Sequence, residues 1–212
     1  MNTTKLGLAA AALAAALSLA GCAAGSGTDS GTGTTPSHGM NHGSSRPMSS
    51  AAPDASADHN AADIMFSQMM IPHHAQAVEM SEIMLAKTGI PAAVTSLATR
   101  IKAAQAPEIE QMTGWLQNWN QPTGMMSGHA MSGGGMSGMV SAEDLDKLKA
   151  AGGNEAAKLF LTQMVAHHDG AIAMAQTEVE SGEFIKTIEL AKAIITSQQA
   201  EIEEMKQLLA AL

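Results

Sequence analysis

The sequence predicts an all-α protein, an antiparallel four-helix bundle made of two repeated helical hairpins. One repeated segment carries a histidine pair, His73-His74 and then His167-His168 ninety-four residues later, with methionines at matching positions around each pair. A second segment of the form Gln-x-x-Glu-Ile-x-x-Met starts at Gln105 and recurs ninety-three residues later. No stretch alternates apolar and polar residues as a half-buried strand would, so helices remain the only regular element expected.

Each expected helix has recognisable boundaries. Gly89 interrupts the first apolar helical pattern, and Pro91 suits the first turn of the next helix. Ser141 is a suitable N-cap for a short helix, and Gly182 separates the last two long helices. The long helices are expected at residues 61–87, 91–119, 155–180 and 184–211, with the short helix at 141–151. Four long helices with short turns inside each pair are typical of an antiparallel bundle.

The N-terminal residues predict export and lipid anchoring. Residues 1–21 contain Lys5 followed by an apolar run that is long enough for a signal peptide and short for a membrane span. The run ends in Leu-Ala-Gly-Cys, which resembles the lipobox of bacterial lipoproteins, so we expect Cys22 to be lipidated. Residues 22–58 are mostly small and polar and are expected to form a disordered tether before a single domain at 59–212. The expected location is outside the cytoplasm, at the bacterial cell membrane.

Charge and cysteine content exclude several functions. The formal net charge of −9 argues against nucleic acid and anionic lipid surfaces as partners. Cys22 is the only cysteine, so neither a disulfide framework nor a thiolate metal site is expected. The anchor would therefore be the lipid itself and not a basic surface.

The histidines fall on the apolar faces of the expected helices. At about 100° per residue, His73 and His167 lie at the centre of apolar stripes, and His74 and His168 lie at their edges. If each hairpin turns at Gly89 or Gly182, polar residues of the partner helices reach the same height. Gln105 and Gln198 are then level with His73 and His167, and Glu108 and Glu201 are level with Met70 and Met164. Buried polar groups need partners, so this layer is either a metal site or a hydrogen-bonded His–Gln network.

A methionine-rich loop is expected at residues 121–140. Its Gly and Ser spacing prevents a helix with a buried face, so core packing does not explain its methionines. Thioether and imidazole groups together favour Cu(I), and histidine also binds Cu(II). The loop ligands would be Met125, Met126, His129, Met131, Met136 and Met139, and the tether has a thinner set in His38, Met40, His42 and Met48, with His59 further on. The alternative is low-complexity drift with no ligand role.

The paired segments resemble a known family. The two His-His segments, each followed by Gln-x-x-Glu-Ile-x-x-Met, are similar to the domain of unknown function 305 over residues 61–212. The resemblance implies a ferritin-like four-helix bundle, and in some members an extracytoplasmic role in copper binding. It implies metal ligands at His73, His74, His167 and His168, with Met70, Met80, Met164 and Met174 as the matching methionines. The hairpin register adds Gln105, Gln198, Glu108 and Glu201 as residues that would surround these ligands.

Three functions are consistent with these observations. The first is a lipid-anchored protein that sequesters or buffers copper, or transfers it to a copper-handling partner. The second is a metal-dependent oxidase of ferritin-like type, although the sequence lacks the Glu-x-x-His motif of di-iron bundles. The third is a metal-free envelope interaction module whose histidines are structural. No catalytic residues are identified, and the oligomeric state is not predicted.

Overall fold

The computed structural model describes residues 59–124 and 136–212. These residues form the helices α1 (Ala61–Leu85), α2 (Ala92–Asn118), α3 (Ala142–Ala150), α4 (Gly153–Ser181) and α5 (Ile185–Ala211). The predicted all-α class is confirmed, and each helix begins and ends within about two residues of its expected boundary. Ser141 caps α3 as predicted, because its side chain accepts a hydrogen bond from the Asp144 N–H.

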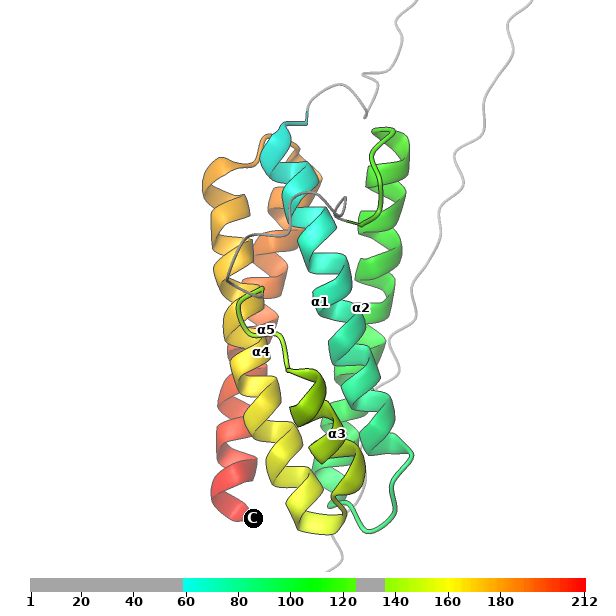
Figure 1. The fold of residues 1–212 in the computed structure, drawn as a ribbon. Helices are drawn as coiled ribbons and strands as arrows, with labels where there is room; N and C mark the ends of the chain where they lie inside the picture. Colours follow the sequence, from blue (N-terminus) through cyan, green and yellow to red (C-terminus); the bar gives the residue numbers. More distant parts are fainter. Residues whose placement is uncertain (1–58, 125–135) are drawn as a thin grey trace, which may run out of the picture. The chain divides into compact units, whose positions relative to one another are not determined.

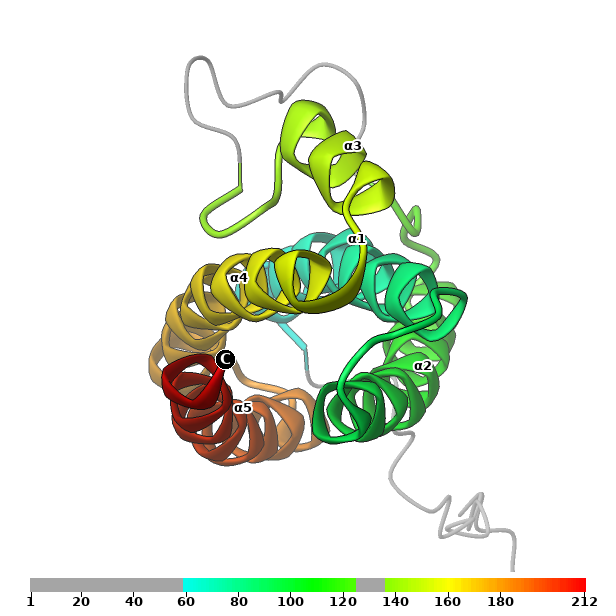
Figure 2. The ribbon, with the colours of Figure 1, turned by 90° about the horizontal axis from the view of Figure 1, so that it is seen from below.

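The long helices form two antiparallel hairpins. Figure 1 shows α1 beside α2 and α4 beside α5, and end-on the four long helices form one bundle (Figure 2). The hairpins contact each other mainly through α1 and α4, whereas α2 and α5 make few contacts with each other. The short α3 lies outside the four-helix arrangement, against α1 and α4 (Figure 2). The helices that carry the histidine pairs are therefore the two at the interface between the hairpins.

Apolar side chains fill the bundle in two clusters. One contains Met80, Met84, Phe160 and Met164, and the other contains Met70 and Met112 with the aromatic residues near one end of the bundle. Burying a methionine or leucine side chain stabilises the fold by about 1.5–3 kcal/mol. Within the described ranges, no helix combines the length and apolar character that a membrane span requires. The expected signal peptide, Cys22 and the tether lie outside the described residues.

A buried carboxylate connects the two hairpins. Asp63 in the first turn of α1 is completely buried and accepts hydrogen bonds from the N–H groups of Glu183 and Phe184 and from the Thr187 hydroxyl. The N-terminus of α5 has no capping side chain from its own segment. Asp63 of the other hairpin instead accepts hydrogen bonds from the backbone N–H groups at the start of α5. Burial by itself would raise the pKa of Asp63, but these bonds and the Asn60 N–H outweigh it and lower the pKa below its usual value.

Glu178 lies beside this carboxylate. It is buried, with 1% of its surface exposed, and neither carboxyl oxygen has a hydrogen-bond partner among the described residues. Burial raises the pKa of Glu178 to about 8; the Thr187 hydroxyl opposes the shift, and the Asp63 charge adds to it. Glu178 therefore holds a proton in the folded protein at neutral pH.

We expect Asp63→Ala to reduce the free energy of unfolding by more than about 2 kcal/mol. Each buried donor left without an acceptor costs about 1–3 kcal/mol, and Asp63 serves several. Urea unfolding measures the loss. Asp146→Ala on the exposed surface of α3 is the control, and an equal effect of the two substitutions would contradict the role of Asp63.

We expect the stability of the protein to fall as pH rises from about 6.5 to about 8. Across this interval folded Glu178 keeps its proton, whereas the carboxyl group of the unfolded chain, with its ordinary pKa of 4.5, has already lost it. Below about pH 6.5 the lowered pKa values of the buried His73 and His167 act in the opposite direction, because the unfolded chain then binds protons that the folded protein does not. The lowered pKa of Asp63 acts only at more acidic pH. Glu178→Gln should flatten this slope in urea unfolding series, and Glu180→Gln, at an exposed position, should leave it unchanged.

Candidate metal centre

Four histidines lie buried where the hairpins meet. His73 and His74 come from α1 and His167 and His168 from α4, and none exposes more than 1% of its surface. The rings of His73 and His167 face each other across the interface, with centroids 3.7 Å apart and planes tilted by 40°. We call these four residues the histidine tetrad. The repeat in the sequence thus becomes a pairing of equivalent residues in space.

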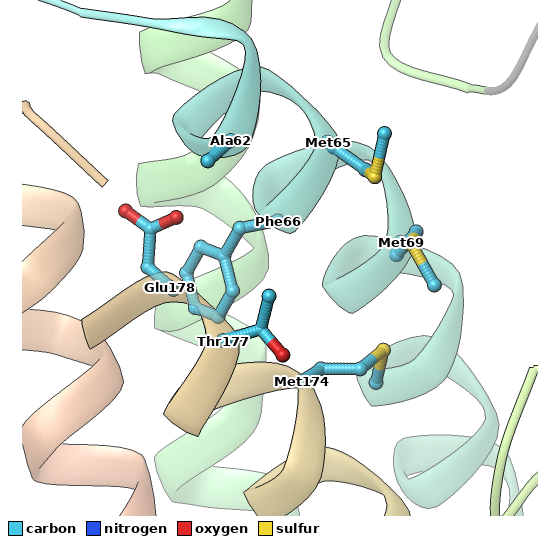
Figure 3. Close-up of a pocket in the computed structure, with 7 residues that line it drawn as sticks. All are labelled: Ala62, Met65, Phe66, Met69, Met174, Thr177 and Glu178. Atoms are coloured by element: carbon cyan, nitrogen blue, oxygen red, sulfur yellow. The ribbon is translucent and has the colours of Figure 1, made fainter. Parts of the chain in front are cut away.

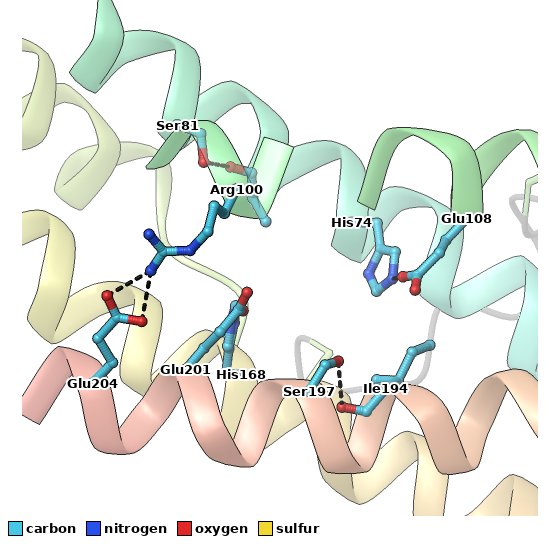
Figure 4. A network of polar contacts seen from close by, with 10 residues as sticks. His74, Ser81, Arg100, Glu108, His168, Ile194, Ser197, Glu201 and Glu204 are labelled. Carbon is cyan, nitrogen blue, oxygen red and sulfur yellow. Dashed lines mark hydrogen bonds and ion pairs between the residues drawn. The ribbon is translucent and has the colours of Figure 1, made fainter. Parts of the chain in front are cut away.

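Each outer histidine pairs with a glutamate of its own hairpin. His74 Nε2 lies 2.7 Å from Glu108 Oε2, and His168 Nε2 lies 2.6 Å from Glu201 Oε2 (Figure 4). The expected register placed these glutamates level with Met70 and Met164, one helical turn away. Side chains lean toward the N-terminus of their helix, so Glu108 and Glu201 reach back to the histidines. They also cover His74 and His168, which the helical pattern had placed at the edge of the buried face.

The partners of the Nε2 atoms determine which ring nitrogens carry hydrogen. Carboxylate oxygens accept from His74 and His168, and the Ser137 carbonyl oxygen accepts from His73 Nε2 at 3.3 Å. In these three rings Nε2 is therefore the donor, and Nδ1 is left with a lone pair. Nδ1 of all four histidines, and also Nε2 of His167, is buried without a hydrogen-bond partner among the described residues. Such a concentration of unpartnered buried nitrogens is unusual in a folded protein.

The inner rings are neutral over the physiological range. Burial, followed by the nearby imidazole of His74, lowers the pKa of His73 to about 4. Burial, followed by the charge of His73, lowers the pKa of His167 to about 2. Neutral imidazole is the form that coordinates a metal ion, so these two rings offer lone pairs without first losing a proton.

One end of the methionine-rich loop lies across the tetrad. Gln76 of α1 donates to the Val140 carbonyl and accepts from the Val140 N–H, at 2.9 and 2.8 Å. At the equivalent position of the second repeat stands Gly170, and a Cβ atom there would collide with the Ser137 carbonyl. The segment 137–140 is thus bound to α1, packs closely on α4 and supplies the acceptor for His73. We call residues 137–140 the strap.

The other predicted site residues occupy several environments. Met70, Met80 and Met164 are completely buried within the apolar clusters, and Met174 is partly buried in a groove between α1 and α4. Gln105 and Gln198 are each 3% exposed, and within the described part of the chain the amide oxygen of each has no hydrogen-bond partner. Met136 directly precedes the strap, Met139 lies within it, and both are partly buried. Outside the described residues lie the loop ligands Met125, Met126, His129 and Met131 and the tether ligands His38, Met40, His42 and Met48. His59, by contrast, stacks on Trp119 with ring centroids 4.4 Å apart.

The donor atoms favour a soft ion. Within residues 59–124 and 136–212, no group of three or more His, Cys, Asp or Glu side chains is placed to hold one metal ion. The glutamates bond to imidazoles, which is unlike a carboxylate cage of the di-iron kind. Lone pairs of neutral imidazoles, supplemented by thioethers, are the donors that copper accepts. The glutamates would orient the rings, as outer partners of metal-bound histidines commonly do.

Sequence reasoning missed the strap and the buried acids. Nothing in the helical pattern relates Ser137 to His73, because the contact depends on how the loop returns over the bundle. The only signal was Gly170 at a helical position where the first repeat has Gln76. The buried Asp63 and Glu178 were likewise not anticipated.

The fold and the tetrad define a class of small helical bundles built from duplicated histidine-bearing hairpins. The model of the family called domain of unknown function (DUF305) matches residues 63–209. The chain belongs to this family, as its paired segments predicted. None of the curated proteins matches it significantly.

Several solved structures of the family are similar. A DUF305 protein of Streptomyces coelicolor, assigned as secreted, is 37% identical, with a TM-score of 0.66 over 71% of this chain and 93% of that one. A DUF305 fragment from Deinococcus radiodurans is 32% identical, with a TM-score of 0.63 over 72% and 98% of the two chains. CopM in its Cu(I)-bound form is 35% identical, with a TM-score of 0.59 over 70% and 96%. CopM structures with Cu(II) and silver are similar as well.

We expect Gly170→Ala to release the strap. The added methyl group would overlap the Ser137 carbonyl and remove the acceptor of His73, at a cost of about 1–3 kcal/mol. Hydrogen exchange of the Val140 amide should accelerate, and urea unfolding should occur at lower concentration. Gly114→Ala in α2, where a Cβ meets nothing within 4 Å, should instead stabilise by about 0.5–1 kcal/mol. Unchanged Val140 exchange in Gly170→Ala would contradict this role.

Proposed function

We propose that this protein binds copper outside the cytoplasm, at the cell membrane, and sequesters, buffers or transfers it. The observation that carries the proposal is the set of buried, unpartnered Nδ1 atoms in the tetrad. Three of the four rings have their Nε2 hydrogen directed to an oxygen, which leaves Nδ1 as a donor to a metal ion. The copper-bound and silver-bound forms of the relative CopM support a soft ion as the cargo.

In this proposal the tetrad acts as the inner site. His73 and His167 offer neutral imidazoles from opposite hairpins to one ion. His74 and His168, oriented by Glu108 and Glu201, are the remaining proposed imidazole ligands, and among the described residues the four rings are not gathered around one point. The buried Met70, Met80 and Met164, together with Met174, are the proposed thioether ligands. Cu(I) is favoured because the available donors are soft, and imidazoles also accept Cu(II). No bond in a substrate need be made or broken for this function.

The remaining parts of the chain would serve capture and anchoring. The strap, at the C-terminal end of the methionine-rich loop, contacts His73, so ions bound by the loop thioethers would be delivered next to this histidine. We propose residues 1–21 as a signal peptide, lipidated Cys22 as the membrane anchor and residues 22–58 as the tether to the domain. The apolar run before Cys22 and the acidic net charge of −9 support a lipid anchor over a basic membrane-binding surface.

An anaerobic Cu(I) titration against a chromophoric chelator tests the tetrad, using residues 50–212, the compact unit that contains the core. We expect His73→Leu with His167→Leu to abolish binding of the inner ion, since leucine fills the space without a donor atom. We expect Glu108→Gln with Glu201→Gln to weaken that ion about 10–100-fold, because the rings lose their orienting partners.

Glu110→Gln is the matched control, because Glu110 is exposed on the same helix as Glu108. The glutamate variants leave the histidines in place, so they remain informative if the leucine variant is poorly folded. Cu(I) affinity and stoichiometry that stay unchanged in both tetrad variants would rule out the inner site. The tetrad would then be a structural network in a metal-free interaction module.

A further inference from the structure

A methionine-lined pocket lies in the groove between α1 and α4. Met65 and Met69 of α1 and Met174 of α4 line it, together with Phe66, Thr177 and Glu178 (Figure 3). Met65 is 53% exposed, and Met69 and Met174 are partly buried, so the thioethers are accessible from solvent. The pocket volume of about 210 Å³ leaves room for an ion among these side chains.

The three methionines lie on one side of the pocket. Figure 3 shows their side chains on the same side of the Phe66 ring, with the Glu178 carboxyl group on the other side. Thioether sulfur is a soft donor that selects Cu(I) over hard cations. The acidic chain, with a net charge of −9, further favours a cation over an anion as the occupant.

Two of the pocket methionines share a face of α1 with His73 of the tetrad. Met65, Met69 and His73 follow one another at intervals of four residues, so they lie on one face of α1, roughly 6 Å apart along its axis. His73 in turn faces His167 of α4, the helix that supplies Met174. The row therefore runs from an exposed thioether to the buried imidazoles.

We propose that Met65, Met69 and Met174 form a second Cu(I) site, at the entrance of a route from solvent to the histidine tetrad. The site would take monovalent soft ions through three thioethers and exclude hard divalent cations. This inference rests on the proposed copper function, because it assumes that the tetrad is the destination of the ion. It moves Met174 from the proposed ligands of the tetrad to those of the groove, because Met174 lines the pocket.

The repeat supplies an internal comparison. The residues of the second repeat equivalent to Met65 and Met69 are Leu159 and Gln163, and the Gln163 amide donates to the Asp144 carbonyl at 3.1 Å. Methionine is thus not required for packing at these positions of the hairpin. The three methionines line the groove near the N-terminal end of α1.

The experiment uses residues 50–212 with the tetrad disabled by His73→Leu and His167→Leu. The loop residues Met125, Met126, His129 and Met131 are replaced by serine, and the partly buried Met136 and Met139 by leucine. We expect this protein still to bind one equivalent of Cu(I), and its X-ray absorption spectrum to show sulfur ligands. Adding Met65→Leu, Met69→Leu and Met174→Leu should remove that equivalent, since leucine keeps the apolar volume but lacks the donor. The matched control is Met84→Leu with Met112→Leu and Met205→Leu, three fully buried methionines outside the pocket.

The outcomes separate the two proposals. Retention of the sulfur-bound equivalent after the three pocket substitutions, or its loss in the control, would overturn the pocket site and leave the tetrad untouched. Absence of any bound Cu(I) once the tetrad and loop are disabled would overturn it as well. The proposed function would instead be refuted if the tetrad substitutions, made alone with the pocket and the loop unaltered, left Cu(I) binding unchanged. That conclusion would hold whatever the pocket variants do.

Discussion

Burying four imidazole rings at one interface is the constraint that organises this protein. A polar group moved out of water without a partner costs several kcal/mol, so each ring requires a neighbour that can satisfy it. Glu108 and Glu201 supply acceptors from α2 and α5, and the Ser137 carbonyl supplies one from the strap. The register of both hairpins and the path of the loop are thus tied to the histidines. The imidazole nitrogens that remain buried without a hydrogen-bond partner among residues 59–124 and 136–212 are the part of this constraint still unmet.

Much of this arrangement follows from periodicity. The helical spacing placed His73 and His167 at the centre of apolar faces, and the structure buries both. The positions of Gly89 and Gly182 gave the hairpin register to within one turn. The one-turn error in register changes the predicted partner of each glutamate. Glu108 and Glu201 were expected level with methionines, and they bond to histidines instead. Backbone register alone ignores the lean of side chains along a helix, which moves a carboxylate by several ångströms.

Other features were beyond sequence reasoning because they join distant segments without a periodic signal. The bonds from the start of α5 to Asp63 span more than a hundred residues, and no pattern in either segment requires the other. The same is true of the strap, whose carbonyl meets Gly170 only because the loop crosses α4 at that point. That α1 and α4 carry the interface between the hairpins was likewise a hypothesis until the packing was known.

Departures from the repeat show where the two halves of the bundle differ. Asp63, Glu178 and Thr187 form a buried polar cluster at one end, whereas their equivalents Ala157, Met84 and Val94 form an apolar contact in the other half. The apolar residues pack their end of the bundle without polar contacts. The hydrogen bonds of the polar cluster are therefore not needed for packing. The polar cluster joins the turn of the second hairpin to the start of the first, beside the methionine-lined pocket. The duplicated core thus places paired histidines at the centre, and the unequal ends give the bundle a direction from an accessible thioether groove to a buried imidazole pair.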